Sequence, residues 1–357
     1  YEEERFLFSF AESLMETEIE TLTLLMFGTL ALLLMAGLPM AFVVGGLGVV
    51  FIYLVGGQTM VNIIPTRIYP LMSNADLAAI PLFIFMASML EKAGLIEEMF
   101  DVVYKWMGGL NGGLAAATIL ASTILAAMVG VIGAAVVTMG IIALPAMLKR
   151  NYDHKIALGS IMAGGTLGIL IPPSILAILY AVIAQQSVGQ LYLGSLVPGL
   201  MLSGMYIAYV LFRTLLNPKL GPALPREERV SFTQKLRLFR NLIAPIFLVF
   251  LVLGLLFGGI ATPVEAAGIG SFGAIIVAII HKRFSLQALR DASVTTARAS
   301  AMVLWIIFGA SIFVGFFILE GGQDFITETI LGTGLSPYGI LLLMMFILVF
   351  LGMFLDW

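Results

Sequence analysis

The residues best suited to chemistry lie at an interruption in a long apolar run near the middle of the chain. The interruption reads Gly164-Gly165-Thr166-Leu167-Gly168-Ile169-Leu170-Ile171-Pro172-Pro173-Ser174. The paired prolines remove two backbone N–H donors and the glycines loosen the preceding turn, so we expect a helix to break here. In hydrocarbon a broken helix survives only inside protein or beside a polar cavity, because unpaired peptide groups cost several kcal/mol each. Freed carbonyls and helix ends at mid-membrane depth commonly hold an ion or an anionic solute, so the break predicts a transport site.

A second element, residues 113–148, is too long for one crossing and contains small residues near its centre, which indicates a re-entrant helical hairpin. Carbonyls of its tip and of the break, with two hydroxyls, could hold a hard cation such as Na⁺. A kinked helix packed through small residues would explain the glycines alone, but the Pro-Pro break opposite a tip favours a site. The predicted ion- or solute-binding residues are Gly130, Val131, Gly133, Ala134, Thr166, Gly168, Pro172, Pro173, Ser174 and Asp356, with Gly130, Gly133, Thr166, Gly168 and Ser174 as the Na⁺ candidates.

Two carboxylates stand at the ends of apolar runs. Asp356 closes the run 336–357, near the tip of a second predicted hairpin. Intramembrane carboxylates are costly, which favours an ion or solute role over a carboxylate beside a frayed end. Glu265 belongs to Thr262-Pro263-Val264-Glu265, a capping box with proline at the first helical position. A capping role is the simpler interpretation of Glu265, although its position leaves a gating role open.

The composition limits the class of protein. Of 357 residues, 61% are hydrophobic and 11% are charged, against roughly 25% charged in soluble proteins, so we expect an all-α polytopic membrane protein. No cysteine is present, and both histidines lie in basic loops without acidic partners at ligand spacing. We therefore expect no enzyme, no catalytic residue, no cofactor beyond a coupling ion and no nucleic-acid partner. A passive channel is disfavoured, because no polar stripe that could line a pore recurs in the sequence.

The basic residues predict how the chain crosses the membrane. Apolar runs long enough for a crossing lie near 21–38, 40–56, 79–98, 156–187, 190–215, 240–258, 264–281 and 299–320. One orientation places all but two of the 18 Lys and Arg, Arg5 and Arg67, on the cytoplasmic side. The same orientation places the acidic N-terminus on the periplasmic side. Charged and apolar residues alternate at helical spacing in 91–107 and 284–298, which suits helices along the cytoplasmic surface.

The chain also repeats itself weakly. Pro39 recurs as Pro263, Gly45 as Gly270, Ala87-Ser88 as Ala310-Ser311, and Gly130 as Gly352, all at nearly the same offset. With the orientation above, the two copies face opposite ways, which is typical of inverted-repeat transporters. The second copy stops after Asp356-Trp357, so we expect a C-terminally incomplete chain.

Three motifs in this order resemble the large, DctM-type membrane subunit of tripartite ATP-independent periplasmic (TRAP) transporters. They are Ile142-Ala143-Leu144-Pro145-Ala146-Met147-Leu148-Lys149-Arg150-Asn151-Tyr152-Asp153, then the Gly164–Ser174 break, then Ala261-Thr262-Pro263-Val264-Glu265-Ala266-Ala267; the final Gly352-Met353-Phe354-Leu355-Asp356 also matches. The resemblance implies an elevator-type, Na⁺-driven importer in the bacterial inner membrane. It further implies a carboxylate-bearing solute, a periplasmic binding protein and a small membrane subunit as partners.

The chain departs from the family pattern at the first tip, where Val131 and Ile132 replace serines, so backbone carbonyls must supply most ligands there. Ala146 also stands where the family often has Glu. A binding-protein-independent carboxylate or ion transporter with the same repeat is the alternative function. We expect an acidic segment at 1–20, scaffold helices with an arm at 21–112, and a first hairpin with the broken helix at 113–189. Scaffold helices with a second arm should follow at 190–298, and the start of the second transport module at 299–357.

Overall fold

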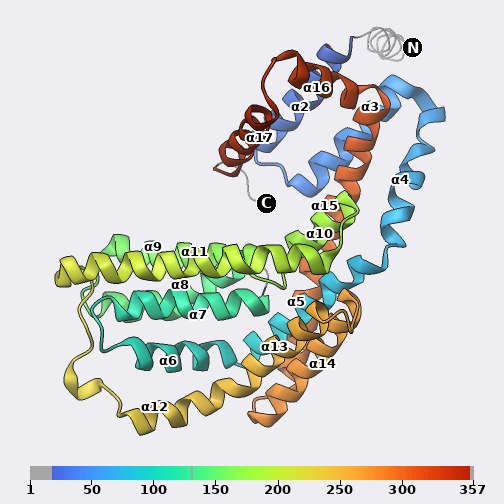
Figure 1. Cartoon of the computed structure of the whole chain (residues 1–357). Helices are drawn as coiled ribbons and strands as arrows, with labels where there is room; N and C mark the ends of the chain where they lie inside the picture. Colours follow the sequence, from blue (N-terminus) through green and yellow to red (C-terminus); the bar gives the residue numbers. More distant parts are fainter. Residues whose placement is uncertain (1–17, 130–131, 354–357) are drawn as a thin grey trace. The chain divides into compact units, whose positions relative to one another are not determined.

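The computed structural model describes residues 18–129 and 132–353, and within these ranges the chain is helical with no β-strand. It divides into two compact units (Figure 1). The first unit comprises Tyr1–Asn74 and Ala301–Trp357, and the second comprises Ala75–Ser300. Among the described residues, five helical segments are long and apolar enough to cross a membrane, with His154–Ala184 counted as one, and up to eight if each bent helix pair counts as one span. The predicted all-α polytopic membrane fold is confirmed.

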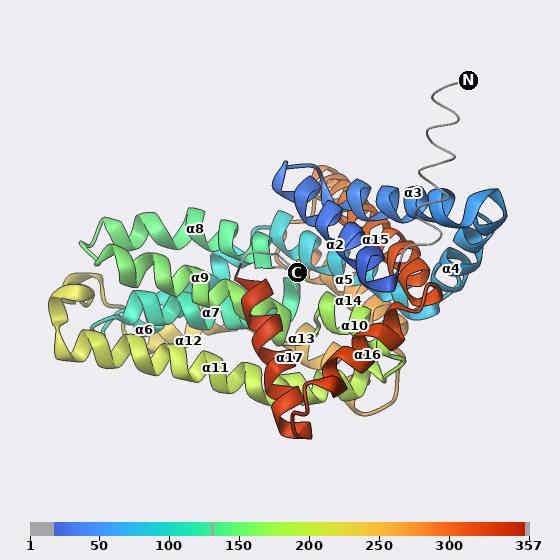
Figure 2. The same ribbon diagram turned by 90° about the horizontal axis from the view of Figure 1, so that it is seen from above.

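The second unit contains the predicted hairpin and the predicted break. Its helices are α5 (Ala79–Lys92), α6 (Leu95–Met107), α7 (Gly113–Val129), α8 (Ile132–Leu148), α9 (His154–Leu170), α10 (Ile175–Ala184), α11 (Val188–Leu216), α12 (Phe232–Phe239), α13 (Ile243–Phe257) and α14 (Pro263–Ile280). Figures 1 and 2 show α7, α8, α9 and α11 running side by side, and α7 and α8 both contact α9. The core of this unit is therefore built around the segments that the sequence singles out.

The chain folds back between α7 and α8, as the long apolar run predicts. Each limb has 17 residues, which is about 26 Å of helix and less than the ~30 Å of a bilayer's hydrocarbon core. The Leu114 amide, at the start of α7, donates to the Tyr152 hydroxyl, just beyond the end of α8, at 3.2 Å. The two limbs therefore begin and end at the same base, which is the geometry that a re-entrant hairpin requires.

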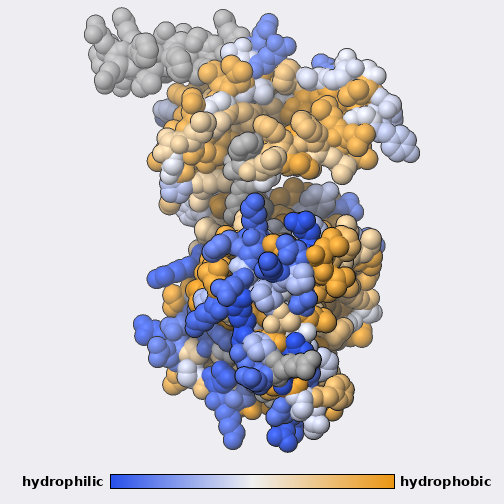
Figure 3. Space-filling model, turned by 90° about the vertical axis from the view of Figure 1, so that its left-hand side faces the viewer, coloured by the Kyte–Doolittle hydropathy of each residue, from blue (hydrophilic) through white to orange (hydrophobic). Residues whose placement is uncertain are grey.

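The connection after α11 holds that base together. In this connection, the Gly221 carbonyl accepts from the Gly112 amide at 2.7 Å, and the Leu220 carbonyl accepts from the Asp153 amide at 3.0 Å. Arg150 forms an ion pair with Glu228 in the same connection. Hydrophilic residues gather on the face of the unit that carries this base, with hydrophobic residues along the border (Figure 3). This distribution fits the predicted exposure of the base at a membrane surface.

In the first unit, α2 (Ile19–Met35), α3 (Met40–Met60) and the end of α15 (Leu286–Leu319) pack together. A Cβ added to Gly309 of α15 would lie 2.8 Å from the Gly45 nitrogen and 3.0 Å from its Cα. The two backbones can approach this closely only because both residues lack side chains. The remaining helices of the unit are α4 (Ile63–Met72), α16 (Gly322–Gly332) and α17 (Pro337–Gly352).

The helix boundaries fit the sequence repeat. Pro39 and Pro263 each stand at a helix start, before α3 and at the first residue of α14. One repeat later, α17 begins and ends where the offset from α7 places it. The predicted capping box at α14 is confirmed, because the Thr262 hydroxyl accepts from the Glu265 amide and the Glu265 carboxylate accepts from the Thr262 amide. The opposite orientation of the copies stays a prediction.

One expected surface helix differs from the structure. Residues 284–298 do not form a separate element, because α15 runs without interruption from Leu286 to Leu319 over 34 residues. The charges in this segment suggested a boundary, but no proline or glycine lies between Leu286 and Phe308 to end the helix. The other expected surface helix, within 91–107, is present as the separate helix α6.

Candidate ion and solute site

The predicted break in the apolar run is confirmed. Helix α9 ends at Leu170, α10 begins at Ile175, and the four residues between them are not helical. The whole interruption is buried, from Ile171 at 2% exposure to Ser174 at 0%. Helix α11 covers it closely, since a Cβ on Gly199 would lie 2.8 Å from Ile171 Cγ1. The break therefore lies inside protein, where an interrupted helix is tolerated in a membrane.

Side chains replace part of the hydrogen bonding that the prolines remove. In a continuous helix Pro173 would donate to the Ile169 carbonyl, but proline has no N–H. The Ser174 hydroxyl takes over this role and donates to the Ile169 carbonyl at 2.7 Å. The same hydroxyl caps α10 by accepting from the Ala177 amide at 3.4 Å. Ser174 thus stabilises both helix ends at the break.

One carbonyl of α9 loses its helical donor at the same place. Pro172 occupies the position whose N–H would reach the carbonyl of Gly168, and it has none to give. Gly168 is buried. A buried carbonyl without its helical donor is a ligand of the type that Na⁺ prefers, and it has the negative partial charge of a helix C-terminus.

Two glycines of α9 bring the hairpin close to the broken helix. A Cβ on Gly164 would lie 2.6 Å from Ser122 Oγ of α7, and a Cβ on Gly165 would lie 2.1 Å from Val136 Cγ2 of α8. Each glycine therefore faces a different limb. Any larger residue would push the hairpin away from α9, so the glycines fix the distance between the two predicted parts of the site.

The structure does not bring all the predicted residues together. Thr166 is exposed on α9, and its hydroxyl donates to the Ala163 carbonyl at 2.8 Å, whereas Ser174 is buried. No hydrogen bond among the described residues joins these two hydroxyls. Pro172 and Pro173 are buried with Ser174. Gly133 and Ala134 belong to the first turn of α8, while Gly130, Val131 and Asp356 lie outside the described residues.

Sequence reasoning missed two side chains near this site. The buried Tyr192 hydroxyl of α11 donates to the Ser174 carbonyl at 3.1 Å. Ser122 Oγ is buried beside Gly164 with no hydrogen-bond partner in the described part of the chain. A tyrosine and a serine inside apolar helices carry no signal of a partner in another helix, so neither could be assigned from the sequence.

The arrangement defines a polytopic helical membrane protein with a helical hairpin packed on an interrupted helix, an architecture typical of secondary transporters. Comparison with known families agrees with this class. Residues 27–357 match the family described as Tripartite ATP-independent periplasmic transporter, DctM component. The chain belongs to this family. The family consists of transporter permeases and not of enzymes.

Several curated relatives are similar over most of the chain. The C4-dicarboxylate TRAP transporter large permease protein DctM of Rhodobacter capsulatus is 30% identical over 348 residues, covering 93% of this chain and 78% of the relative. The isethionate TRAP transporter permease protein DctMQ of Oleidesulfovibrio alaskensis is 30% identical, covering 93% and 52%. The ectoine/5-hydroxyectoine TRAP transporter large permease protein UehC of Ruegeria pomeroyi is 30% identical, covering 80% and 65%.

Proposed function

We propose that this TRAP large permease subunit imports a carboxylate-bearing solute across the bacterial inner membrane together with Na⁺. The observation that supports the proposal is the buried break at Ile171–Ser174, where Pro172 withholds the donor of the Gly168 carbonyl. A monovalent cation needs oxygen ligands, and backbone carbonyls supply them. It needs no fixed counter-charge beside it. Tip residues Gly130, Val131, Gly133 and Ala134 complete the proposed ion site, with Asp356 at the second tip.

The ion would order the site before the solute binds. Cation charge beside the break lowers the cost of bringing an anionic group into a low-dielectric region, so ion and solute binding favour each other. The hairpin and the broken helix would then move as one module in an elevator cycle. The close contacts at Gly164 and Gly165 support this, since they leave no space for the hairpin to slide independently.

The solute class is proposed from the relatives. Two of the relatives above are named for compounds that carry a carboxylate, C4-dicarboxylate and ectoine, and one is named for a sulfonate, isethionate. A periplasmic binding protein and a small membrane subunit are the proposed partners, in agreement with the word tripartite in the family description. The N-terminus is proposed to lie on the periplasmic side.

Uptake by the permease, reconstituted with both partners in liposomes, tests the coupling. We expect uptake to require an inward Na⁺ gradient. Uptake that is unchanged in Na⁺-free medium under a proton gradient would overturn Na⁺ coupling. A thermal-shift screen of the binding protein against carboxylic acids and sulfonates tests the solute class, and stabilisation by sulfonates alone would overturn the carboxylate assignment.

A backbone variant tests the site itself. Pro172→Ala restores an N–H at this position, which allows α9 to extend and pair the Gly168 carbonyl, so we expect a several-fold higher Na⁺ concentration for half-maximal uptake. Pro145→Ala is the matched control, because Pro145 is an exposed proline inside α8. An equal Na⁺ dependence in the two variants would remove the break from the ion site.

A further inference from the structure

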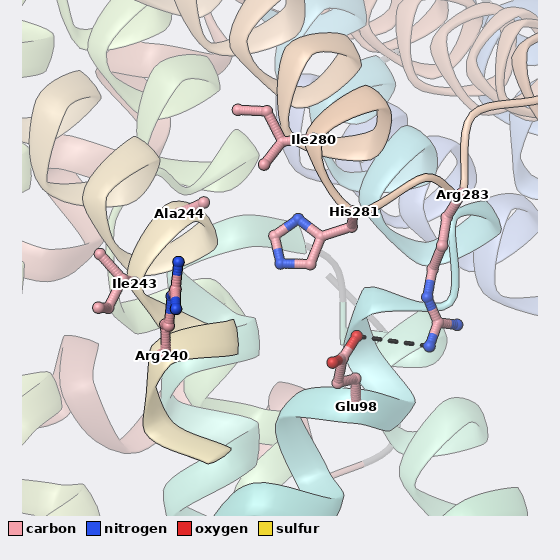
Figure 4. A pocket seen from close by; sticks show the side chains of 7 residues that line it. All are labelled: Glu98, Arg240, Ile243, Ala244, Ile280, His281 and Arg283. Carbon is pink, nitrogen blue, oxygen red and sulfur yellow. Dashed lines mark ion pairs between the residues drawn. The ribbon is translucent and has the colours of Figure 1, made fainter. Parts of the chain in front are cut away.

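A cavity of about 510 Å³ lies in the second unit, away from the hairpin tip and the helix break. It forms where α12 leads into α13 through a short turn (Arg240–Leu242), where α14 ends, and where α6 begins. Its lining residues are Glu98, Arg240, Ile243, Ala244, Ile280, His281 and Arg283 (Figure 4). The predicted orientation places these residues at the cytoplasmic boundary of α13 and α14.

The charges in the cavity leave an excess of positive charge. Arg283 Nη2 pairs with Glu98 Oε2 at 3.4 Å, and Arg283 Nη1 donates to the Gly94 carbonyl at 3.4 Å. Arg240 forms no ion pair with a carboxylate of the described residues. Two guanidinium groups and one carboxylate therefore leave one net positive charge. In Figure 4 the Arg240 and His281 side chains both lie in the space between α13 and the end of α14.

The end of α14 holds the histidine in place. The His281 Nδ1 lies 2.9 Å from the Val277 carbonyl. Because a carbonyl can only accept, Nδ1 carries the proton of this hydrogen bond. The amides of Lys282 and Arg283 donate to the Ile279 and Ala278 carbonyls, which caps the helix. The basic groups thus stand on a fixed turn.

Apolar surface adjoins the basic groups on the membrane side. Ile243 is 54% exposed and Phe247 is 63% exposed on α13, and Ile280 is 63% exposed on α14. Helix α14 is long and apolar enough to cross a membrane, and α13 is so together with α12 as a bent pair. In a bilayer we expect these exposed side chains to face acyl chains. A cationic cavity next to exposed apolar side chains is suited to bind a molecule with a phosphate at one end and hydrocarbon at the other.

We propose that this cavity binds the phosphate group of an anionic phospholipid, with Arg240 as the main charge partner and His281 and Arg283 beside it. The acyl chains would lie along Ile243, Phe247 and Ile280. A free phosphate offers the same headgroup chemistry but gains nothing from the apolar surface, which favours the lipid.

Lipid titration of the purified permease tests the proposal. Thermal unfolding is measured in nanodiscs of phosphatidylcholine with increasing phosphatidylglycerol. We expect phosphatidylglycerol to stabilise the wild type, and Arg240→Gln to bind it about fivefold more weakly, the effect of one arginine near a charged membrane surface. Arg240→Lys, which keeps the charge, should recover most of this preference and shows that the position tolerates substitution.

Two controls separate this cavity from general surface charge. Arg237→Gln removes a charge from the last turn of α12 that does not line the cavity, so it should keep the wild-type preference. An equal loss in Arg237→Gln and Arg240→Gln, or no loss in Arg240→Gln, would overturn the site. Stabilisation of the detergent-solubilised protein by millimolar inorganic phosphate, equal to that by phosphatidylglycerol, would assign the cavity to a soluble anion and overturn the lipid proposal.

Discussion

Both units contain a place where two helices meet at glycines, but only one of these contacts lies beside a broken helix. In the first unit Gly45 and Gly309 bring α3 and α15 together, and in the second unit Gly164 and Gly165 bring α9 against the hairpin. The first contact borders an apolar groove of about 530 Å³ lined by Phe42, Gly45, Gly46, Val49, Val50, Ile68, Trp305, Phe308, Gly309 and Ile312. The second contact is enclosed by α7, α8 and α9.

The comparison shows that close glycine packing does not mark a binding site. The glycines in both units serve helix approach, as small residues commonly do in membranes. What distinguishes the second unit is the loss of backbone donors at Pro172 and Pro173, a few residues after the close contact. Substitutions at the two contacts should therefore have comparable effects on packing, and different effects on transport.

The largest effect on stability is expected from Gly309→Ala. Its Cβ would meet the backbone of α3 at Gly45, which cannot rotate away, so the helices must separate. We expect a loss of about 3 kcal/mol. Thermal unfolding of the purified protein measures this. Gly46→Ala is the control, because it lies in α3 next to Gly45 and has nothing within 4 Å of an added Cβ. Similar losses in both variants would contradict the close contact.

A somewhat smaller loss is expected from Gly165→Ala, about 2 kcal/mol. The new methyl group would overlap Val136 Cγ2, a side-chain atom on a stiff β-branched residue. The double variant Gly165→Ala/Val136→Ala should regain part of the stability, as a double-mutant cycle would show. Gly159→Ala, with nothing within 4 Å of its added Cβ, is the control in the same helix. Additive losses of stability in the double variant would contradict the predicted overlap.

Ser174→Ala should cost about 1–2 kcal/mol, because it removes an N-cap and leaves the half-buried Ile169 carbonyl without its donor. Thr166→Ala is the comparison, since the Thr166 hydroxyl is exposed and bonds within its own helix turn. In thermal unfolding, the Ser174→Ala variant should be clearly less stable than the Thr166→Ala variant. The reverse ranking would show that Ser174 does not stabilise the two helix ends.

The smallest effect is expected at the hairpin base. Tyr152→Phe leaves the Leu114 amide without its acceptor, which should cost about 1 kcal/mol at neutral pH. Burial raises the pKa of Tyr152 to about 12, from its ordinary value of about 10. The protonated form is therefore favoured by folding, so this contribution is complete below pH 10 and is lost as the pH rises through 12. Unfolding of both proteins at pH 8 and pH 11 measures the difference, which should be smaller at pH 11.

Local sequence signals predicted the backbone features well. Proline has no N–H in any context, so the break at Pro172 follows from the sequence alone. The capping box at Thr262 and Glu265 is likewise contained within four residues. The fold-back of 113–148 followed from its length, which exceeds one crossing but suits two short limbs.

Contacts between distant segments could not be predicted in the same way. Tyr192 reaches the Ser174 carbonyl, and Arg150 reaches Glu228, only because separate helices pack together. The cavity around Arg240 and Arg283 is formed by segments that are far apart in the chain. Without the packing, each of these residues appears as an ordinary polar side chain in a helix or loop.

The break also has a consequence for how such a protein is studied. The oxygen atom of Gly168 belongs to the main chain, and every amino acid placed at that position would present the same atom. Substitution of the side chain at position 168 therefore cannot remove this oxygen atom. Chemistry that alters the main chain itself, such as an ester in place of a peptide bond or a residue with an N–H in place of Pro172, is the way to reach it.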